Sequence, residues 1–338
     1  CVFSSKAVTA MRIITAKTPG GPEVLSIAEV ETPTPSAQQV LIKVHAAGLN
    51  RADLMQRQGK YPPPPGAPEH PGLEVAGEIV ACGADVSEFA VGQRVCALLA
   101  GGGYAEYCVA DAGQVLPIPD EMDFVHAAAL PEACFTVWTN VFEIAGLSGS
   151  ESLLVHGGTS GIGVMAIQIA KVRGHITIAT AGSTEKVAFC EQLGAHTAIN
   201  YREQDFVAVT RESTQGAGVN VILDMIGGAY LSRNVDALAI DGRLVMIATQ
   251  GGTKGELDVL KVMQRRVRVT GSTLRSRSIA FKRHIRDQLR MHVWPDIELG
   301  KIRPIVDRVF DFEAAADAHA YMERGSHIGK IVLRVRAS

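Results

Sequence analysis

Residues 161–166 read Gly-Ile-Gly-Val-Met-Ala, and this short string decides how the chain is expected to fold. It follows an apolar run at 152–156 and opens a stretch with helical spacing at 167–170. Glycine leaves room for a phosphate to approach the backbone, and the unpaired N–H groups at a helix N-terminus attract an anion. A second apolar strand follows at 175–179. This order predicts a dinucleotide-binding βαβ unit, although the string alone would also suit an ordinary tight strand-to-helix turn.

The residues after the second strand indicate which dinucleotide is bound. Enzymes that prefer NAD usually place Asp or Glu there, where the carboxylate binds the ribose hydroxyls and repels a 2′-phosphate. Here the strand end is neutral, Ser183 supplies a hydroxyl, and Lys186 lies just inside the next helix. Glu185 begins that helix and is first a partner of its dipole. We therefore predict that NADPH is preferred over NADH; the alternative is that Lys186 is a solvated helix residue.

Length, charge and cysteine content narrow the class of protein. A chain of 338 residues is expected to form two domains. Its net charge of −2, without long runs of one sign, gives no reason to expect a nucleic-acid or membrane partner. Six cysteines without a C-x-x-C pair argue against a disulfide framework and a structural zinc site, so we predict a cytoplasmic protein. Residues 1–10 lack the apolar core of a signal peptide and are interpreted as an N-terminal extension.

The chain changes character near residue 131. Residues 11–130 contain short apolar strands separated by Gly and Pro, which indicates an irregular β-rich domain. Residues 131–273 alternate helix and strand, which predicts a doubly wound parallel sheet of the Rossmann type. Residues 274–338 end in helix–strand–helix–strand and are expected to return to the β-rich domain. The predicted fold class is thus α/β with two domains, and the cleft between them is the expected active site.

Several motifs lie in a fixed order along the chain. They are Ala-Gly-Leu-Asn-Arg-Ala-Asp-Leu-Met-Gln-Arg-Gln-Gly at 47–59, Tyr-Pro-Pro-Pro-Pro-Gly at 61–66, Leu-Pro-Glu-Ala at 130–133, His-Gly-Gly-Thr-Ser-Gly-Ile-Gly at 156–163 and Ile-Gly-Lys-Ile-Val-Leu at 328–333. With them the chain resembles the medium-chain dehydrogenase/reductase superfamily, and within it the zinc-free, zeta-crystallin-like quinone oxidoreductases of the tumour-suppressor-inducible group. The resemblance covers residues 11–335 and implies a GroES-like catalytic domain joined to a Rossmann cofactor domain.

The zinc-bearing members of this superfamily provide a contrast. They carry a cysteine on the loop after the strand that matches residues 40–45, and a histidine directly before the glutamate of the next segment. Here the loop offers Asn50 and Asp53, and Leu73 precedes Glu74. Zinc requires three or four N, S or O ligands that converge on it. We therefore predict that this chain binds no metal.

Candidate catalytic residues follow from the chemistry that the resemblance implies. A nicotinamide would carry the hydride, so the protein has to position it and stabilise negative charge on the acceptor oxygen. A reduced quinone is a weakly basic anion that water can protonate. By resemblance, Asn50 and Tyr61 line the nicotinamide and substrate pocket, with Tyr104 as a weaker third donor. Asn50 could instead cap a helix at 52–58, and Tyr61 could simply cover the loop end.

The predicted cofactor-binding residues lie at strand ends, helix starts and connecting loops, and most are assigned by resemblance. They are Asn50, Thr136, Thr159, Ser160, Gly161, Ile162, Gly163, Ser183, Lys186, Tyr201, Ile226, Gly227, Leu274, Arg275, Gly329 and Lys330.

These expectations together predict an enzyme that uses NADPH to reduce quinones, by hydride or stepwise electron transfer and without a metal. Two alternatives remain: an NADPH-dependent reductase of other conjugated carbonyls such as alkenals, and a cofactor-binding module without activity. The strand at 267–271 would end the cofactor sheet with an open edge, and pairing of two copies would cover it. We therefore predict a homodimer.

Overall fold

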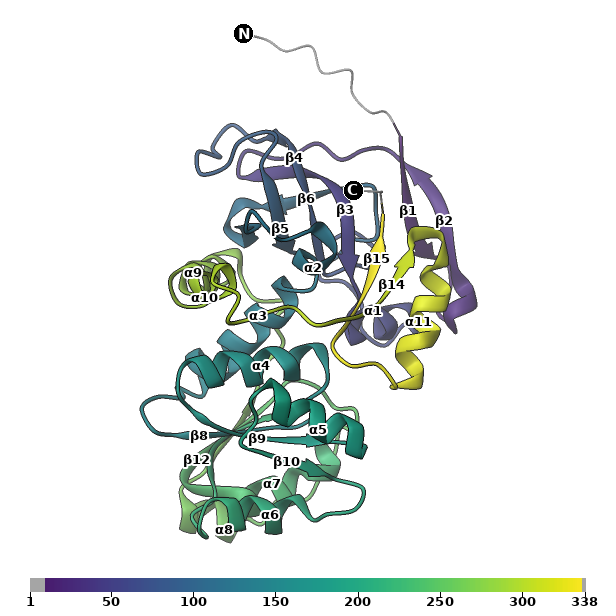
Figure 1. The fold of residues 1–338 in the computed structure, drawn as a ribbon. Coiled ribbons are helices and arrows are strands. Elements are labelled where there is room, and N and C mark those ends of the chain that lie inside the picture. The colour runs from purple at the N-terminus through teal and green to yellow at the C-terminus, as the bar shows by residue number, and fades with distance from the viewer. Residues whose placement is uncertain (1–9, 336–338) are drawn as a thin grey trace. The chain divides into compact units, whose positions relative to one another are not determined.

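The structure is a computed structural model that describes residues 10–335, and the chain divides into two compact units (Figure 1). The first, here the β-rich unit, comprises the residues up to Glu132 with 275–290 and those from 304 onward. The second, here the Rossmann unit, comprises 133–274 and 291–303. Segment 291–303 thus groups with the Rossmann unit, whereas the sequence analysis placed it in the β-rich domain. Residues 1–9 of the predicted extension lie outside the described residues.

The β-rich unit is built on a seven-stranded mixed sheet in the order β14-β15-β3-β4-β5-β7, with β6 paired to β3. The strands are β3 (Gln39–Gly48), β4 (Glu74–Cys82), β5 (Arg94–Leu98), β6 (Tyr107–Asp111), β7 (Val115–Pro117), β14 (Val306–Asp311) and β15 (Lys330–Arg334). A separate hairpin pairs β1 (Met11–Ala16) with β2 (Leu25–Val30). Alternating burial along the first half of β3 shows why this sequence forms a strand with one face in the core.

Three strand ends meet at one place in this unit. Leu49 N, just after β3, donates to Ile331 O of β15 at 2.9 Å, and Ala47 is paired with Val75 of β4. The helix α1 (Arg51–Arg57) starts directly after β3, with Asn50 as its N-cap. The remaining helices of the chain's β-rich segments are α2 (Phe124–Ala127), α9 (Ile279–His292) and α11 (Ala315–Arg324). Residues far apart in sequence, namely 49–53, 74 and 330, are therefore brought together.

The Rossmann unit is a six-stranded parallel sheet in the order β10-β9-β8-β11-β12-β13. Its strands are β8 (Ser152–Val155), β9 (Ile176–Ala181), β10 (Thr197–Asn200), β11 (Val219–Asp224), β12 (Leu238–Met246) and β13 (Arg268–Gly271). The chain order reverses at β8, whose neighbours are β9 and β11. Ligands of such sheets bind outside the carboxyl ends of the strands at this switch point. The predicted α/β fold class, a β-rich GroES-like part plus a parallel Rossmann sheet, is confirmed.

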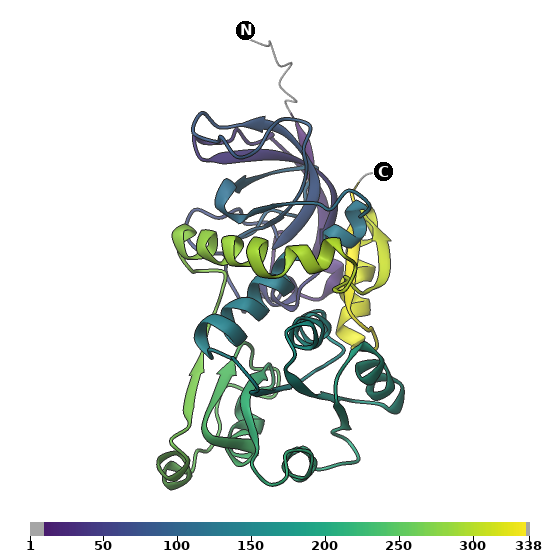
Figure 2. The same cartoon turned by 60° about the vertical axis from the view of Figure 1, so that its left-hand side comes forward.

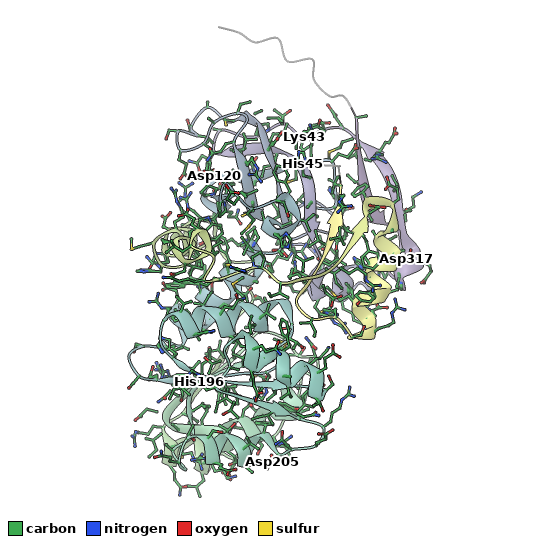
Figure 3. All side chains as sticks on the ribbon, in the orientation of Figure 1. Lys43, His45, Asp120, His196, Asp205 and Asp317 are labelled. Atoms are coloured by element: carbon green, nitrogen blue, oxygen red, sulfur yellow. The ribbon has the colours of Figure 1, made fainter. Side chains whose placement is uncertain are left out.

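Helices cover both faces of the parallel sheet. Figure 1 shows α4 (Gly161–Val172) and α5 (Thr184–Leu193) on one face, and α6 (Phe206–Ser213), α7 (Leu231–Ala237) and α8 (Val259–Arg265) on the other; Figure 2 shows the same layers after a turn. Four of these helices begin at a Ser or Asp whose side chain accepts a backbone N–H, which satisfies a donor that the helix leaves unpaired. Asp205, labelled in Figure 3, caps α6 in this way and also pairs with Arg233 at 2.8 Å.

The segment 131–144 is helical throughout: α3 (Pro131–Val137) continues into a π-helix at Trp138–Ile144. The short helix α10 (Trp294–Glu298) belongs to the Rossmann unit. None of the helices in the described part of the chain combines the length and the hydropathy needed to span a bilayer.

Candidate active site

In the β-rich unit, the backbone N–H and both side-chain polar atoms of Asn50 form hydrogen bonds with neighbouring residues. Its backbone N–H donates to Asp53 Oδ2 at 2.8 Å, and its Nδ2 donates to Glu74 Oε1 at 2.9 Å. Its Oδ1 accepts from Lys330 Nζ at 2.7 Å. The residue is 9% exposed. Asn50 is therefore the helix N-cap that the sequence analysis considered, and its amide also belongs to a buried polar cluster.

Lys330 contributes a buried ammonium group to that cluster. It donates to Leu49 O at 2.8 Å and to Asn50 Oδ1, and it forms an ion pair with Glu74 Oε1. An ammonium group has three N–H donors, so these contacts use all of them inside the β-rich unit. The structure thus brings Lys330 to Asn50, while its predicted contact with a coenzyme stays a prediction.

Two further carboxyl groups lie near this ion pair: Asp53, which was expected to accept hydrogen bonds from local backbone, and Glu132, to which sequence reasoning assigned no role. Asp53 accepts from Asn50 N and from Gly72 N at 2.9 Å, and burial raises the pKa of its carboxyl to about 6. Glu132 donates its backbone N–H to Glu74 Oε2 at 2.9 Å. Burial, followed by the charge of Glu74, raises the pKa of the Glu132 carboxyl to about 7. The signal in the sequence was Glu74 itself, an acid at the start of the largely apolar strand β4, which has to find a partner when buried.

Tyr61 is held by Arg275. The guanidinium carbon of Arg275 lies 5.3 Å from the centre of the Tyr61 ring. The same guanidinium donates to Gln56 Oε1 and to Ala100 O, each at 2.7 Å, and to Tyr61 O at 3.4 Å. Burial, followed by the charge of Glu132, raises the pKa of the Tyr61 phenol. The Tyr61 hydroxyl is therefore protonated at neutral pH. The Arg275 guanidinium contacts the Tyr61 ring and holds it in place.

The structure does not support Tyr104 as a donor to an acceptor. Its side chain is fully buried, and its hydroxyl is 3.1 Å from His319 Nε2. Its backbone N–H donates to Pro71 O at 3.0 Å, so the whole residue lies inside the β-rich unit.

In the Rossmann unit, the predicted phosphate turn has the shape that a phosphate requires. Ser160 Oγ accepts from Gly163 N at 2.9 Å and caps α4, so Gly161 and Ile162 form its first turn, where backbone N–H groups have no partner within the helix. A Cβ atom at position 163 would lie 2.2 Å from Gly157 O. Only glycine therefore fits at position 163. Thr159, another predicted cofactor residue, is buried in the same turn.

The ends of β9 and β10 bring Ser183, Lys186 and Tyr201 together. Ser183 caps α5 by accepting from Lys186 N at 3.3 Å. Tyr201 follows Asn200, which is paired with Ala181 at the end of β9, and a Cβ at Gly182 would lie 2.7 Å from the Tyr201 hydroxyl. The Ser183 and Tyr201 hydroxyls and the backbone of Lys186 thus come from one small region. This donor set suits a phosphate, and Glu185 in the first turn of α5 is the only acid between 181 and 190.

The turn after β11 is fixed by Asp224. Its carboxylate accepts from Ile226 N at 2.7 Å, from Gly227 N at 3.0 Å and from Asn234 Nδ2 at 3.1 Å. Burial raises the pKa of Asp224. The sequence analysis missed that His156 continues this network, with its Nε2 2.7 Å from Asn234 Oδ1. Asp224 is thus structural, and it shapes the predicted cofactor turn at 226–227.

The other predicted residues are divided between the two units. Thr136 and Leu274 are buried in the Rossmann unit, and the backbone oxygen of Thr136 accepts from Asn140 Nδ2 at 2.8 Å. Gly329 lies in the β-rich unit with a φ of +83°, and a Cβ there would be 2.3 Å from Ile305 O. The positive φ and this close contact are enough to explain why residue 329 is a glycine, with no need to invoke a bound ligand.

A metal site requires several ligand side chains that converge on one point. Among residues 10–335, no group of three or more His, Cys, Asp or Glu side chains is arranged to hold a metal ion. The buried carboxylates of Asp53 and Glu74 are already bound by backbone, amide and ammonium donors. The residues present therefore do not fit a zinc site.

Comparisons with known proteins place the chain in a family. Residues 36–120 match the alcohol dehydrogenase GroES-like domain, and residues 193–333 match the family model described as zinc-binding dehydrogenase. A quinone oxidoreductase of Rattus norvegicus is 34% identical over 326 residues, which is 96% of this chain and 97% of the relative. The chain belongs to the quinone oxidoreductase family of the medium-chain dehydrogenase/reductase superfamily.

Solved structures agree with this placement. The Escherichia coli quinone oxidoreductase in complex with NADPH has a TM-score of 0.84 and 28% identity, and the match covers 96% of this chain and all of that one. An NAD-dependent alcohol dehydrogenase has a TM-score of 0.85 and 31% identity over the same share of each chain. The protein is thus an oxidoreductase, and its relatives include users of either coenzyme.

Proposed function

We propose that this protein uses NADPH to reduce quinones, by hydride or stepwise electron transfer and without a metal. The observation that carries the proposal is the neutral strand end of β9, where Ser183, Lys186 and Tyr201 come together. An enzyme built for NAD would have a carboxylate at that strand end. The quinone substrate is supported by the 34% identical quinone oxidoreductase over nearly the whole length of the chain.

The residues of the Rossmann unit fit this coenzyme. The first turn of α4, with Gly161, Ile162 and Gly163, would hold the pyrophosphate, because its N–H groups have no helix partner and no side chain fills the approach at 163. Ser183, Lys186 and Tyr201 would hold the 2′-phosphate. When bound, NADPH supplies the hydride or electrons for the reduction.

The β-rich unit supplies donors for the acceptor oxygen. Asn50 Nδ2 carries two N–H groups, of which one goes to Glu74, and no other described residue accepts from it. Tyr61 offers a hydroxyl on a ring held by Arg275. Both are neutral donors that stabilise negative charge as it develops on a quinone oxygen. The resulting anion is weakly basic, so water can supply the proton, and no metal is needed to polarise the acceptor.

The experiment is an NADPH oxidation assay with matched acceptors: para- and ortho-quinones, alkenals and simple aldehydes. We expect turnover with quinones that is unchanged after chelation, from protein that contains substoichiometric zinc. Faster turnover of alkenals would instead identify a conjugated-carbonyl reductase. Tight NADPH binding without turnover of any acceptor would favour a binding module.

We also propose a cytoplasmic homodimer. The strand β13 pairs only with β12 and forms the edge of the parallel sheet. Nearby, α8 and the residues before it expose Leu257, Val259, Leu260 and Met263. An open edge beside apolar side chains is commonly covered by a second copy.

A further inference from the structure

The polar cluster around Lys330 contains a cation in a shell of oxygen atoms. Leu49 O, Asn50 Oδ1 and Glu74 Oε1 contact the ammonium nitrogen, the first two at 2.8 and 2.7 Å. The Lys330 side chain is 5% exposed and that of Glu74 is 0% exposed. A buried ammonium group surrounded in this way is not available to solvent. Its role therefore depends on the three oxygen atoms that it contacts within the β-rich unit.

Charge balance explains why a cation belongs there. Glu74 and Asp53 are both fully buried, and the carboxyl of Glu132 lies close enough for its charge to interact with theirs. Lys330 is close to all three, and its charge lowers the pKa of Asp53 and of Glu132 against the effect of burial. Without it, the buried Glu74 carboxylate would lose the cation that contacts it, which is a costly arrangement in a buried place.

The ion pair also determines which way the Asn50 amide points. The two ends of a carboxamide have opposite polarity, because Oδ1 accepts and Nδ2 donates. Here Oδ1 faces the ammonium group of Lys330 and Nδ2 faces the carboxylate of Glu74. A rotation of the amide by half a turn would place the NH2 group against the cation and the oxygen against the carboxylate. The pair therefore selects one of the two orientations.

We infer that Lys330 and Glu74 are positioning residues that lock the Asn50 amide with its donor side available to the acceptor, so that Lys330 acts on the reaction through Asn50. This inference rests on the proposed function, in which Asn50 donates to the acceptor oxygen. It assigns Lys330 to the acceptor side of the chemistry, and it predicts that Lys330 contributes little to coenzyme affinity.

The test compares Lys330→Met, Asn50→Ala and the double variant with Lys17→Met, a matched control at an exposed lysine of the same unit. We expect Lys330→Met to lower kcat about 10- to 100-fold, as is typical for a misplaced catalytic group, and to leave the NADPH Kd within about twofold. The double variant is expected to match Asn50→Ala, because Lys330 has no further effect on kcat once the Asn50 donor is gone. Effects on kcat that multiply, or a main effect on the NADPH Kd, would overturn the inference.

A second readout is independent of turnover. In protein labelled with ¹⁵N-asparagine, the Asn50 amide signal is identified by its loss in Asn50→Ala. We expect this signal to shift or split in unliganded Lys330→Met, and in Glu74→Gln should the lysine variant fail to fold. An unchanged signal would refute the inference. Wild-type protein that reduces no quinone would refute the proposed function, while the amide signal would still decide whether Lys330 orients Asn50.

Discussion

At the scale of single residues, the groups proposed to bind ligands differ from those that are hydrogen-bonded within the protein itself. Ser183 and Lys186 follow the end of β9, Tyr201 follows the end of β10, and we propose that all three bind a phosphate. By contrast, Lys330 and Asp224 are satisfied by their own unit. The sequence could identify residue types and their order, but not that Lys330 is already paired, because Asn50 and Glu74 lie far away from it along the chain.

Lys186 is expected to select the phosphorylated coenzyme. Replacing it with Met removes one charge-assisted contact, which contributes roughly 1.5–3 kcal/mol and therefore about 10- to 150-fold in affinity. Fluorescence titration should show weaker NADPH binding and nearly unchanged NADH binding. Lys171→Met, at the far end of α4, serves as the control and should change neither. Equal loss for both coenzymes would contradict the assignment of Lys186 to the phosphate.

Glu132 is expected to make stability depend on pH. Its pKa rises from 4.5 to about 7 on folding, so the folded protein holds this proton more tightly than the unfolded chain. Stability should therefore fall as pH rises from about 5 to 7, and the loss should persist above pH 7. Glu132→Gln is expected to remove it and to stabilise the protein by about 1–3 kcal/mol at pH 8, with little effect at pH 4. Urea unfolding of both proteins at the two pH values measures this, and an equal difference at both would contradict it.

At the scale of elements, the βαβ unit was the most predictable part. The string at 161–166 has glycine where α4 begins, and the strand-helix alternation after residue 131 gave the parallel sheet correctly. The β-rich unit was harder, because β15 pairs with β3 across nearly the whole sequence. No local pattern indicates that contact, so the cluster of Asn50, Glu74 and Lys330 could not be derived from the sequence.

A substitution at Gly163 tests whether the close packing at the start of α4 matters for coenzyme binding. A Cβ there would lie 2.2 Å from Gly157 O, and relief of this contact has to move the turn that is proposed to hold the pyrophosphate. Gly163→Ala is expected to lower NADPH affinity at least about tenfold. Gly174→Ala, where no atom lies within 4 Å of an added Cβ, should leave NADPH affinity unchanged despite its positive φ. Equal affinities for the two variants, measured by calorimetry, would refute the role of this turn.

At the scale of the whole molecule, two units with different chemistry share one chain. Most of the proposed coenzyme residues belong to the Rossmann unit, and the proposed acceptor donors belong to the β-rich unit. Motif order along the full length was enough to predict the family, because such an order involves both units at once. The acceptor could not be predicted equally well, since it depends on loop paths that no motif specifies.

We predict that two copies of the chain form a homodimer. The edge strand β13 and the exposed side chains of α8 favour a dimer. Light scattering coupled to size exclusion at micromolar concentration should give about twice the chain mass of 35.9 kDa. A mass that stays at one chain over this range would exclude the homodimer.

The most direct test of the account is the ratio of kcat/KM for NADPH and NADH, measured with one para-quinone on protein treated with a chelator. We predict undiminished quinone reduction and a preference for NADPH of about tenfold or more. Equal use of both coenzymes, or activity that disappears on chelation and returns with zinc, would contradict it.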